Sequence, residues 1–367
     1  MKKLNILAAA AALALATQAA CAAPDTYTAV RVDHVYGEHF FKGIAMNAQA
    51  AIVGYSGLPD GVYWYTGPQA LTVQDPPTVI TYWRDMGAIN GINDAGQTTG
   101  SYDLYDASFQ GPHAYVTSPD GKTLTDKNPP GAISSIGTAI DAQGRIVGCA
   151  TNAQGTHAVR TGADGKLHAL PTLGGNKACA AGFNAHGVVV GYSTVASGDT
   201  HAFVTGQHGA GVTDLGTLGG DYANAVAVNL KGWIVGSSKD AGGVSTAFIV
   251  APGSLEMSSV TALDGTGRYA GHPSEADGLD ADGHVVGSAE DNDKGQRPIA
   301  FITGRNGVGI RDLNDFVTGL PKGERVARAA AINASGQILA DSSIDGEAMW
   351  LLTPTRATWA AEIDAGR

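Results

Sequence analysis

The chain has 367 residues, of which 51 are Gly and only 16% are charged, and its formal net charge is −11. This acidic balance repels phosphate backbones and anionic lipid surfaces, so nucleic acid and membrane surfaces are poor partners for it. Low charge combined with abundant Gly is typical of many short strands joined by tight turns, and argues against helical bundles and disordered chains.

The N-terminus has the features of an export signal. A basic start at Lys2 and Lys3 precedes an apolar run over residues 4–16, which is too short to span a bilayer, and a small-x-small cleavage site ends at Ala22. We therefore expect residues 1–22 to be a signal peptide that is removed. The mature protein is then secreted or periplasmic, with no membrane span.

The sequence that follows contains a repeat built on one Asn or Asp position. Seven times, an Asn or Asp is followed seven residues later by Gly or Ala, and in six of the seven units a Gly stands three residues after it. The Asx-x-x-Gly pattern predicts a tight hairpin, in which the Asx side chain caps the turn and Gly adopts a positive φ. The seven pairs are Asn47/Gly54, Asn93/Gly100, Asp141/Gly148, Asn184/Gly191, Asn229/Gly236, Asp280/Gly287 and Asn333/Ala340.

Each unit of the repeat predicts four short strands. One strand precedes the Asx turn and an apolar strand follows it; a third carries a polar-Ala-aromatic pattern, as at residues 200–203, and a fourth follows, as at residues 211–215. Four strands in about 46 residues are typical of one propeller blade. The prediction is an all-β, seven-bladed β-propeller of four-stranded blades over residues 23–355.

The two ends of the repeat predict how the ring closes. The last unit ends at residues 350–353 after three strands, whereas a strand at residues 27–32 precedes the first unit without a partner of its own. We expect this N-terminal strand to close the last blade, because it would cover an otherwise open sheet edge. Residues 356–367 are then a C-terminal surface tail.

Three cysteines are present. Cys21 at the cleavage site is a candidate lipoprotein acceptor, but Gln18 is polar where that signal needs an aliphatic residue, so lipidation is the less favoured interpretation. Cys149 and Cys179 fall on adjacent units. They are either a disulfide, which an oxidising compartment permits, or two small buried side chains.

Three sequence elements resemble a known repeat. They are His-Ala-Phe at residues 201–203, Asp-Leu-Gly-Thr-Leu-Gly-Gly at residues 214–220, and Asn-x-x-Gly-x-Val-Val-Gly from Asn184. Together they resemble the HAF repeat of predicted extracellular bacterial proteins, most closely between residues 156 and 238. The resemblance implies an exported repeat protein, and it brings no activity and no catalytic residues.

The third strands of three units carry a histidine, at His113, His157 and His201. An arc of imidazoles could bind a metal, but metal–nitrogen bonds need about 2.0–2.1 Å. Equivalent residues on neighbouring blades lie too far apart for that, so a structural role is favoured. No cofactor is expected. The acidic run over residues 290–293 leaves calcium binding open as an alternative. Such a run is more often a solvated loop, and its spacing fits no known calcium-binding loop.

The longer connections all fall between the second and third strands or between units, and antiparallel pairing places both kinds at one end of the ring. Long loops on one rim of a rigid scaffold are where binding usually resides. The candidate binding residues there are His34, Tyr82, Trp83, Arg84, Tyr102, Tyr105, Arg268, Tyr269, His272 and Arg325.

Two functions fit this face. In the first, aromatic rings and carboxylates bind an extracellular glycan, peptide or protein, and the protein is a monomeric binding module. In the second, the face is the active site of a polysaccharide lyase for an acidic glycan, with His272 or His34 as general base, a Tyr as general acid, and Arg84 or Arg268 neutralising the uronate. We favour the binding module, because the acidic net charge opposes attraction of a polyanion.

Overall fold

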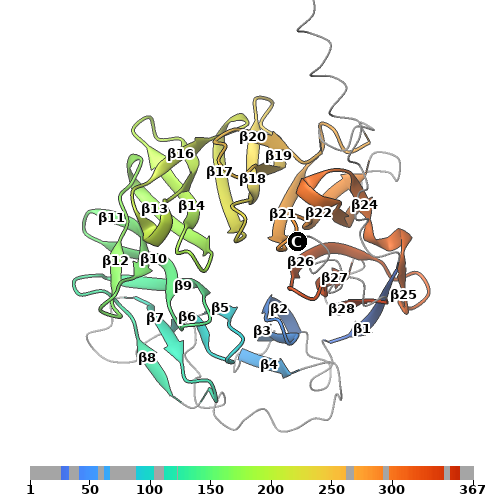
Figure 1. Ribbon diagram of the computed structural model, residues 1–367, viewed down its shortest axis with the longest axis horizontal. Coiled ribbons are helices and arrows are strands. Elements are labelled where there is room, and N and C mark those ends of the chain that lie inside the picture. Colours follow the sequence, from blue (N-terminus) through green and yellow to red (C-terminus); the bar gives the residue numbers. More distant parts are fainter. Residues whose placement is uncertain are drawn as a thin grey trace, which may run out of the picture.

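The computed structural model describes residues 26–32, 41–56, 62–66, 88–102, 111–121, 123–261, 268–291, 297–342 and 348–355. These residues form short strands and three 3-10 turns, at Gln207–Gly209, Arg305–Gly307 and Leu313–Asp315, so the expectation of an all-β fold is confirmed. Figure 1 shows the sheets standing side by side around a common centre. In the part of the chain that the structure describes, no helix has the length and apolar character needed to span a membrane.

Each repeat unit forms an antiparallel sheet that follows the chain order from the centre outward (Figure 1). Unit one contributes β2 (Phe41–Met46), β3 (Ala51–Ser56) and β4 (Val62–Thr66). Unit two is β5 (Ala88–Ile92), β6 (Thr98–Tyr102), β7 (His113–Thr117) and β8 (Leu124–Asp126). Unit three is β9 (Ser134–Ile140), β10 (Ile146–Asn152), β11 (Gly155–Thr161) and β12 (Leu167–Ala169).

Units four to six repeat this order. Unit four is β13 (Gly174–Phe183), β14 (Val189–Val195), β15 (Thr200–Val204) and β16 (Thr213–Gly216). Unit five is β17 (Gly219–Val228), β18 (Ile234–Asp240), β19 (Ser245–Val250) and β20 (Met257–Ser259). Unit six is β21 (Ser274–Leu279), β22 (Val285–Asp291), β23 (Arg297–Thr303) and β24 (Ile310–Asp312).

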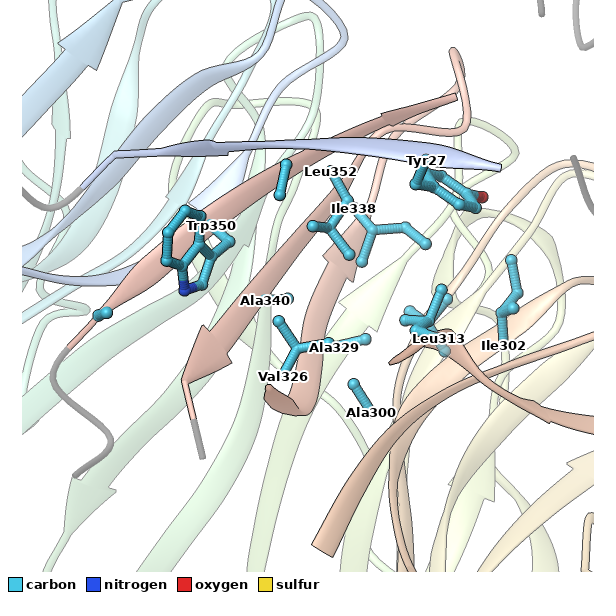
Figure 2. Packing of buried hydrophobic residues seen from close by; sticks show 13 residues of the cluster. Tyr27, Ala300, Ile302, Leu313, Val326, Ala329, Ile338, Ala340, Trp350 and Leu352 are labelled. Atoms are coloured by element: carbon cyan, nitrogen blue, oxygen red, sulfur yellow. The ribbon is translucent and has the colours of Figure 1, made fainter. Parts of the chain in front are cut away.

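The last sheet joins the two ends of the described chain. Unit seven has β26 (Val326–Ile332), β27 (Ile338–Ser342) and β28 (Met349–Pro354), and β1 (Tyr27–Arg31) pairs antiparallel with β28. The short β25 (Val317–Thr318) pairs in parallel with the other edge of β1. Figure 2 shows the Tyr27 ring of β1 beside Leu352 and Ile338, with Leu313 and Ile302 of unit six nearby. The N-terminal strand therefore lies on the edge of unit seven, where the sequence placed it.

The hydrophobic core lies between neighbouring sheets. The aromatic residue of the third strand is fully buried in units four to six, and each one packs against apolar side chains of the preceding unit. Phe203 of β15, for example, shares a cluster with Val147 and Ala158 of unit three. Burying an aromatic side chain of this size contributes about 1.5–3 kcal/mol, so stacking of sheets accounts for the apolar residues on both faces of each strand.

The Asx residues of the repeat link the sheets at their inner ends. In each unit the Oδ1 atom accepts backbone N–H groups from within the turn, as Asn93 does from Ala95 and Gln97. The Nδ2 group of each Asn donates to the backbone carbonyl of the Asx residue in the next unit. The five such bonds are Asn47 to Asn93 (3.1 Å), Asn93 to Asp141 (2.8 Å), Asn184 to Asn229 (2.9 Å), Asn229 to Asp280 (2.9 Å) and Asn333 to Asn47 (3.1 Å).

Two units carry Asp in place of Asn, and a carboxylate has no hydrogen to donate to the next unit. Each of these aspartates instead binds a basic residue four positions later in its own turn. The Oδ2 atom of Asp141 lies 2.6 Å from Nε of Arg145, and that of Asp280 lies 2.7 Å from Nδ1 of His284. The amide link is thus replaced, after units three and six, by a contact within the turn.

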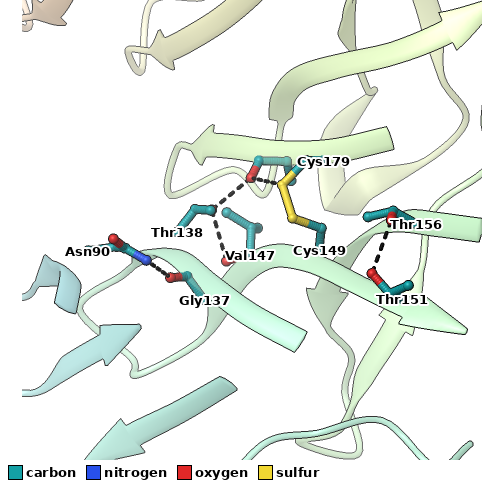
Figure 3. Close-up of a disulfide and its surroundings, with 9 residues drawn as sticks. Asn90, Gly137, Thr138, Val147, Cys149, Thr151, Thr156 and Cys179 are labelled. Carbon is teal, nitrogen blue, oxygen red and sulfur yellow. Dashed lines mark hydrogen bonds between the residues drawn. A yellow bond between two sulfur atoms is a disulfide. The ribbon is translucent and has the colours of Figure 1, made fainter. Parts of the chain in front are cut away.

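Another cross-link joins the sheets at both of these interfaces. Between units three and four, Cys149 and Cys179 form a disulfide (Figure 3). Between units six and seven, Arg328 binds both carboxylate oxygens of Asp277, with Nε at 2.9 Å and Nη2 at 2.6 Å. The hydrogen bond with Asp277 is the main reason that the pKa of Arg328 is raised above its ordinary value.

Replacement of Asn93 by Asp tests the amide link. Asn93→Asp keeps the turn acceptor but loses the donor to Asp141 and buries a charge, so we expect the free energy of unfolding to fall by about 2 kcal/mol. Asn93→Asp combined with Gln97→Arg reproduces the Asp141–Arg145 pair and should recover about half of this loss. Denaturant unfolding measures both variants. The control is Asn152→Asp, whose side chain only accepts the Gln154 N–H group; an equal loss there would contradict the link.

The disulfide interface allows a repair experiment. Cys149→Ala with Cys179→Ala removes a bridge that closes a 30-residue separation, and should lower the free energy of unfolding by about 3–4 kcal/mol. Adding Asp141→Asn and Arg145→Gln to that protein should restore about 1 kcal/mol, because the new amide can donate to the carbonyl of Asn184. The same pair of changes introduced at unit six, as Asp280→Asn and His284→Gln, is the matched comparison. No recovery in unit three would show that geometry, and not the missing donor, leaves this bond unformed.

Candidate functional site

Antiparallel pairing gives the ring two distinct faces. The turns between first and second strands and between third and fourth strands lie at one end, which we call the hairpin face, and the remaining connections lie at the other, the long-loop face. Of the ten candidate binding residues, the structure describes Tyr102, Arg268, Tyr269, His272 and Arg325, all on the long-loop face. The other five, His34, Tyr82, Trp83, Arg84 and Tyr105, lie outside the described residues.

Tyr102 is packed inside the molecule and does not present its ring for stacking. It ends β6, is 7% exposed, and meets the rings of His113 and Tyr115 edge-on with centroids 6.1 and 6.3 Å away. Burial, assisted by the neighbouring Asp126 carboxylate, raises the pKa of Tyr102 to about 12. Its hydroxyl is therefore neutral across the physiological range.

The histidines of the third strand are paired with carboxylates of the fourth. Nδ1 of His113 lies 3.0 Å from Oδ2 of Asp126, and Nδ1 of His201 lies 2.9 Å from Oδ2 of Asp214. The same aspartates accept the backbone N–H group of the residue two positions later, at 2.7 Å in both units. In unit three the position that corresponds to these aspartates is Ala169, which faces Val159 as Asp126 faces Tyr115 and Asp214 faces Phe203, so His157 has no such partner there. These contacts give His113 and His201 a structural role in joining the two outer strands.

Arg268 is held by a buried carboxylate. Its Nε and Nη2 atoms lie 2.9 and 2.5 Å from the two oxygens of Asp291, which is fully buried, and its guanidinium carbon lies 5.3 Å from the centre of the Tyr269 ring. Tyr269 itself is 2% exposed. Nδ1 of His272 lies 3.8 Å from Oε2 of Glu290. Arg268 and Tyr269 are thus part of the packing against β22, whereas Arg84, the alternative arginine of the lyase hypothesis, lies outside the described residues.

Arg325 is anchored in the same way. Its Nη2 atom lies 3.0 Å from Oδ2 of Asp312, a fully buried residue at the end of β24. Asp312 also accepts the backbone N–H of Asn314 at 2.9 Å, which fixes the connection leading to β26. The Arg–carboxylate pairs of this face therefore hold the described residues that lead into β21 and β26.

An exposed aromatic residue on this face was missed by the sequence analysis. Tyr222 is 40% exposed near the start of β17, and the neighbouring Asp221 pairs with Lys239 at 3.0 Å. The sequence analysis drew its candidates from the longer connections, whereas Tyr222 follows the short one between β16 and β17. The ten-residue length of β17, which extends beyond the sheet core, places the ring at the rim.

Metal ligands are not grouped in the part of the chain that can be described. Within those ranges, no set of three or more His, Cys, Asp or Glu side chains is placed to hold an ion. The acidic run over residues 290–293, for which calcium binding was left open, is described only as far as Asp291, and Asp291 binds Arg268.

A cavity of about 260 Å³ lies on the hairpin face, opposite the predicted site. It is lined by the inner turns of units seven, one, two and three, including Asn47, Asn93, Asp94 and Asn333. Figure 1 shows the strands that lead to these turns, β26, β2, β5 and β9, nearest the centre of the ring. The invariant spacing of the Asx column signalled that these turns share one end, but loop length had directed attention to the other.

Comparison with known proteins shows a shared fold and no family. No protein-family model matches the sequence, and no curated protein is significantly similar to it. A mutant of puromycin hydrolase complexed with PGG matches over 84% of this chain and 50% of its own, with 13% identity and a TM-score of 0.50. TolB from Acinetobacter baumannii matches over 73% of this chain, with 13% identity and a TM-score of 0.42, and the present chain spans 61% of its length.

A third similar structure is a catalytically inactive virginiamycin B lyase from Staphylococcus aureus with quinupristin, which matches over 89% of this chain at 12% identity and a TM-score of 0.38. At these identities the likeness concerns the course of the backbone alone. The chain spans half of puromycin hydrolase, so that enzyme's activity does not extend to it through this comparison.

The raised pKa of Tyr102 makes stability depend on pH in alkali. The folded protein holds the phenol proton up to about pH 12, whereas the unfolded chain releases it near pH 10, so stability is complete below pH 10 and falls as the pH rises toward 12. Between pH 9 and 11 this group should cost on the order of 1 kcal/mol. Thermal melts should show a smaller loss over this interval for Tyr102→Phe than for the wild type. Tyr192→Phe is the control, and an equal effect of both changes would refute the assignment.

Proposed function

We propose that this protein is an exported, closed, seven-bladed β-propeller of the HAF-repeat type that acts as a binding module. Three observations support the closed ring. The Asx column recurs seven times, β1 completes the sheet of unit seven, and the amide of Asn333 in that unit donates to the carbonyl of Asn47 in unit one. A cyclic array of this kind has no free sheet edge at the junction of its first and last units.

Export is supported by the leader-like residues 1–22 and by the disulfide. Disulfides form and persist in oxidising compartments, and the Cys149–Cys179 bridge occupies an interface that lacks the amide link. Secretion to the periplasm or beyond would therefore allow this disulfide to form and to stabilise the interface between units three and four.

The engagement of Arg268 is the observation that favours binding over catalysis. A lyase for acidic glycans would need a free guanidinium to neutralise the uronate and an accessible Tyr to protonate the leaving group. Arg268 is committed to the buried Asp291, and Tyr269 beneath it is covered. Such pairs make a rigid rim, which suits recognition because little conformational entropy is lost when a partner binds.

The partner of the long-loop face is an extracellular glycan, peptide or protein. Tyr222 offers an exposed ring for stacking, and its neighbours Asp221 and Lys239 offer hydrogen-bonding groups at the rim. His34, Tyr82, Trp83, Arg84 and Tyr105 are the further candidates that the sequence places on this face.

Incubation with acidic polysaccharides separates the binding module from the alternative lyase. The mature protein is mixed with alginate, pectate and ulvan, and the formation of unsaturated uronide is followed by ultraviolet absorbance. We expect no product above a protein-free blank. Turnover that His272→Ala abolishes, and that the hairpin-face control His186→Ala leaves intact, would reject the binding module and establish the lyase.

A further inference from the structure

The cavity on the hairpin face has the chemistry of a small ligand site. Its walls come from four consecutive units around the ring, and Met46, Ile92 and Ile140, the last residues of three inner strands, supply apolar surface. At about 260 Å³ it is smaller than pockets for drug-sized ligands, which are roughly 300–1,000 Å³. This volume suits a short aliphatic group.

Two of the three Asn amides that border the cavity have both hydrogens in use. Nδ2 of Asn93 donates to Oε1 of Gln97 at 3.0 Å and to the carbonyl of Asp141 at 2.8 Å. Nδ2 of Asn333 donates in the same way, to Gln337 at 2.9 Å and to Asn47 at 3.1 Å. Since an amide nitrogen has two hydrogens, both groups are saturated. Neither of these two amides can donate to a ligand.

The cavity has one carboxylate at its rim, that of Asp94. Asp94 follows Asn93 in the turn of unit two, is exposed, and accepts the backbone N–H of Ala48 at 2.9 Å, which fixes it next to unit one. The corresponding residues in the other three lining units are Ala48, Ala142 and Ala334. The cavity therefore combines a single positioned negative charge with apolar walls.

We propose that this cavity binds a primary alkylammonium group, with the nitrogen at the Asp94 carboxylate and the adjoining methylenes against Met46, Ile92 and Ile140. An ammonium has three donors and no acceptor, which matches the carboxylate acceptor of Asp94. The negative net charge of the protein adds a general attraction for cations. This site is separate from the long-loop face and does not depend on the function proposed for that face.

The test is a titration of the full mature protein with 1,4-diaminobutane, followed by NMR shifts of the inner turns. Asp94→Asn should weaken binding about fivefold, as expected for one partly exposed charge pair, and Ala142→Trp should block the cavity altogether. The control is Asp120→Asn, an exposed carboxylate in the turn between β7 and β8 of the same sheet and face, which should leave binding unchanged. 1,4-Butanediol, which has the same length without charge, should bind at least fivefold more weakly than the diamine, by the same estimate.

A second arm distinguishes a free amine from the lysine side chain of a partner protein. N-acetyl-lysine methylamide carries the same ammonium on a peptide backbone; binding equal to or weaker than that of the diamine supports a free amine, and tighter binding supports a lysyl partner. The proposal is overturned if neither amine shifts the turn signals at millimolar concentration. It is equally overturned if butanediol binds as well as the diamine, or if Asp94→Asn and Asp120→Asn behave alike.

Discussion

The hydrogen bond from an Asn side chain to the next unit's backbone carbonyl is the contact on which the ring depends. Burial of apolar side chains drives neighbouring sheets together but does not fix the angle between them, because it is non-directional. The amide bond is directional. It joins equivalent atoms of adjacent turns at the inner ends of the sheets, and it recurs across five of the seven junctions between consecutive Asx residues, including the one between the last unit and the first. At those five junctions, neighbouring sheets are therefore positioned by the same pair of atoms.

The two exceptions show how the sequence accommodates loss of that contact. Asp at the Asx position occurs together with Arg145 or His284 four residues later, where the carboxylate binds within its own turn. The junctions that follow carry a disulfide and a bidentate Arg–Asp pair, respectively. Both junctions that lack the amide link thus carry another cross-link, and an ion pair between Lys231 and Asp282 also joins units five and six, where the amide link is kept.

Much of the fold could be predicted from the sequence because each unit of the repeat is defined by short local sequence patterns. Residues close together in the sequence define the Asx-x-x-Gly turns, the strand after each turn and the aromatic residue of the third strand. The strand at residues 27–32 had no partner in its own unit, which predicted its pairing with the last sheet. The candidate site could not be predicted as well. Loop length placed Tyr102, Arg268, Tyr269 and Arg325 on the long-loop face. Whether these side chains are available to a ligand depends on carboxylates of other strands that contact them. Those carboxylates belong to Asp126, Asp291 and Asp312. Equally, the cavity is formed by four turns far apart in the chain, so no single stretch reveals it.

The pairing of β1 with β28 has a consequence for how the molecule is made. Thr26 and Thr355, whose contact ends this ladder, are 329 residues apart, so the first strand to be synthesised finds its partner only when the last one is complete. Throughout that interval both strands present unpaired backbone groups, and contacts of such long range form slowly. Two nascent molecules that meet in this state can each donate the first strand to the other and satisfy every contact of the monomer. The strand that joins the ends of one chain is thus also the element through which two chains would exchange parts.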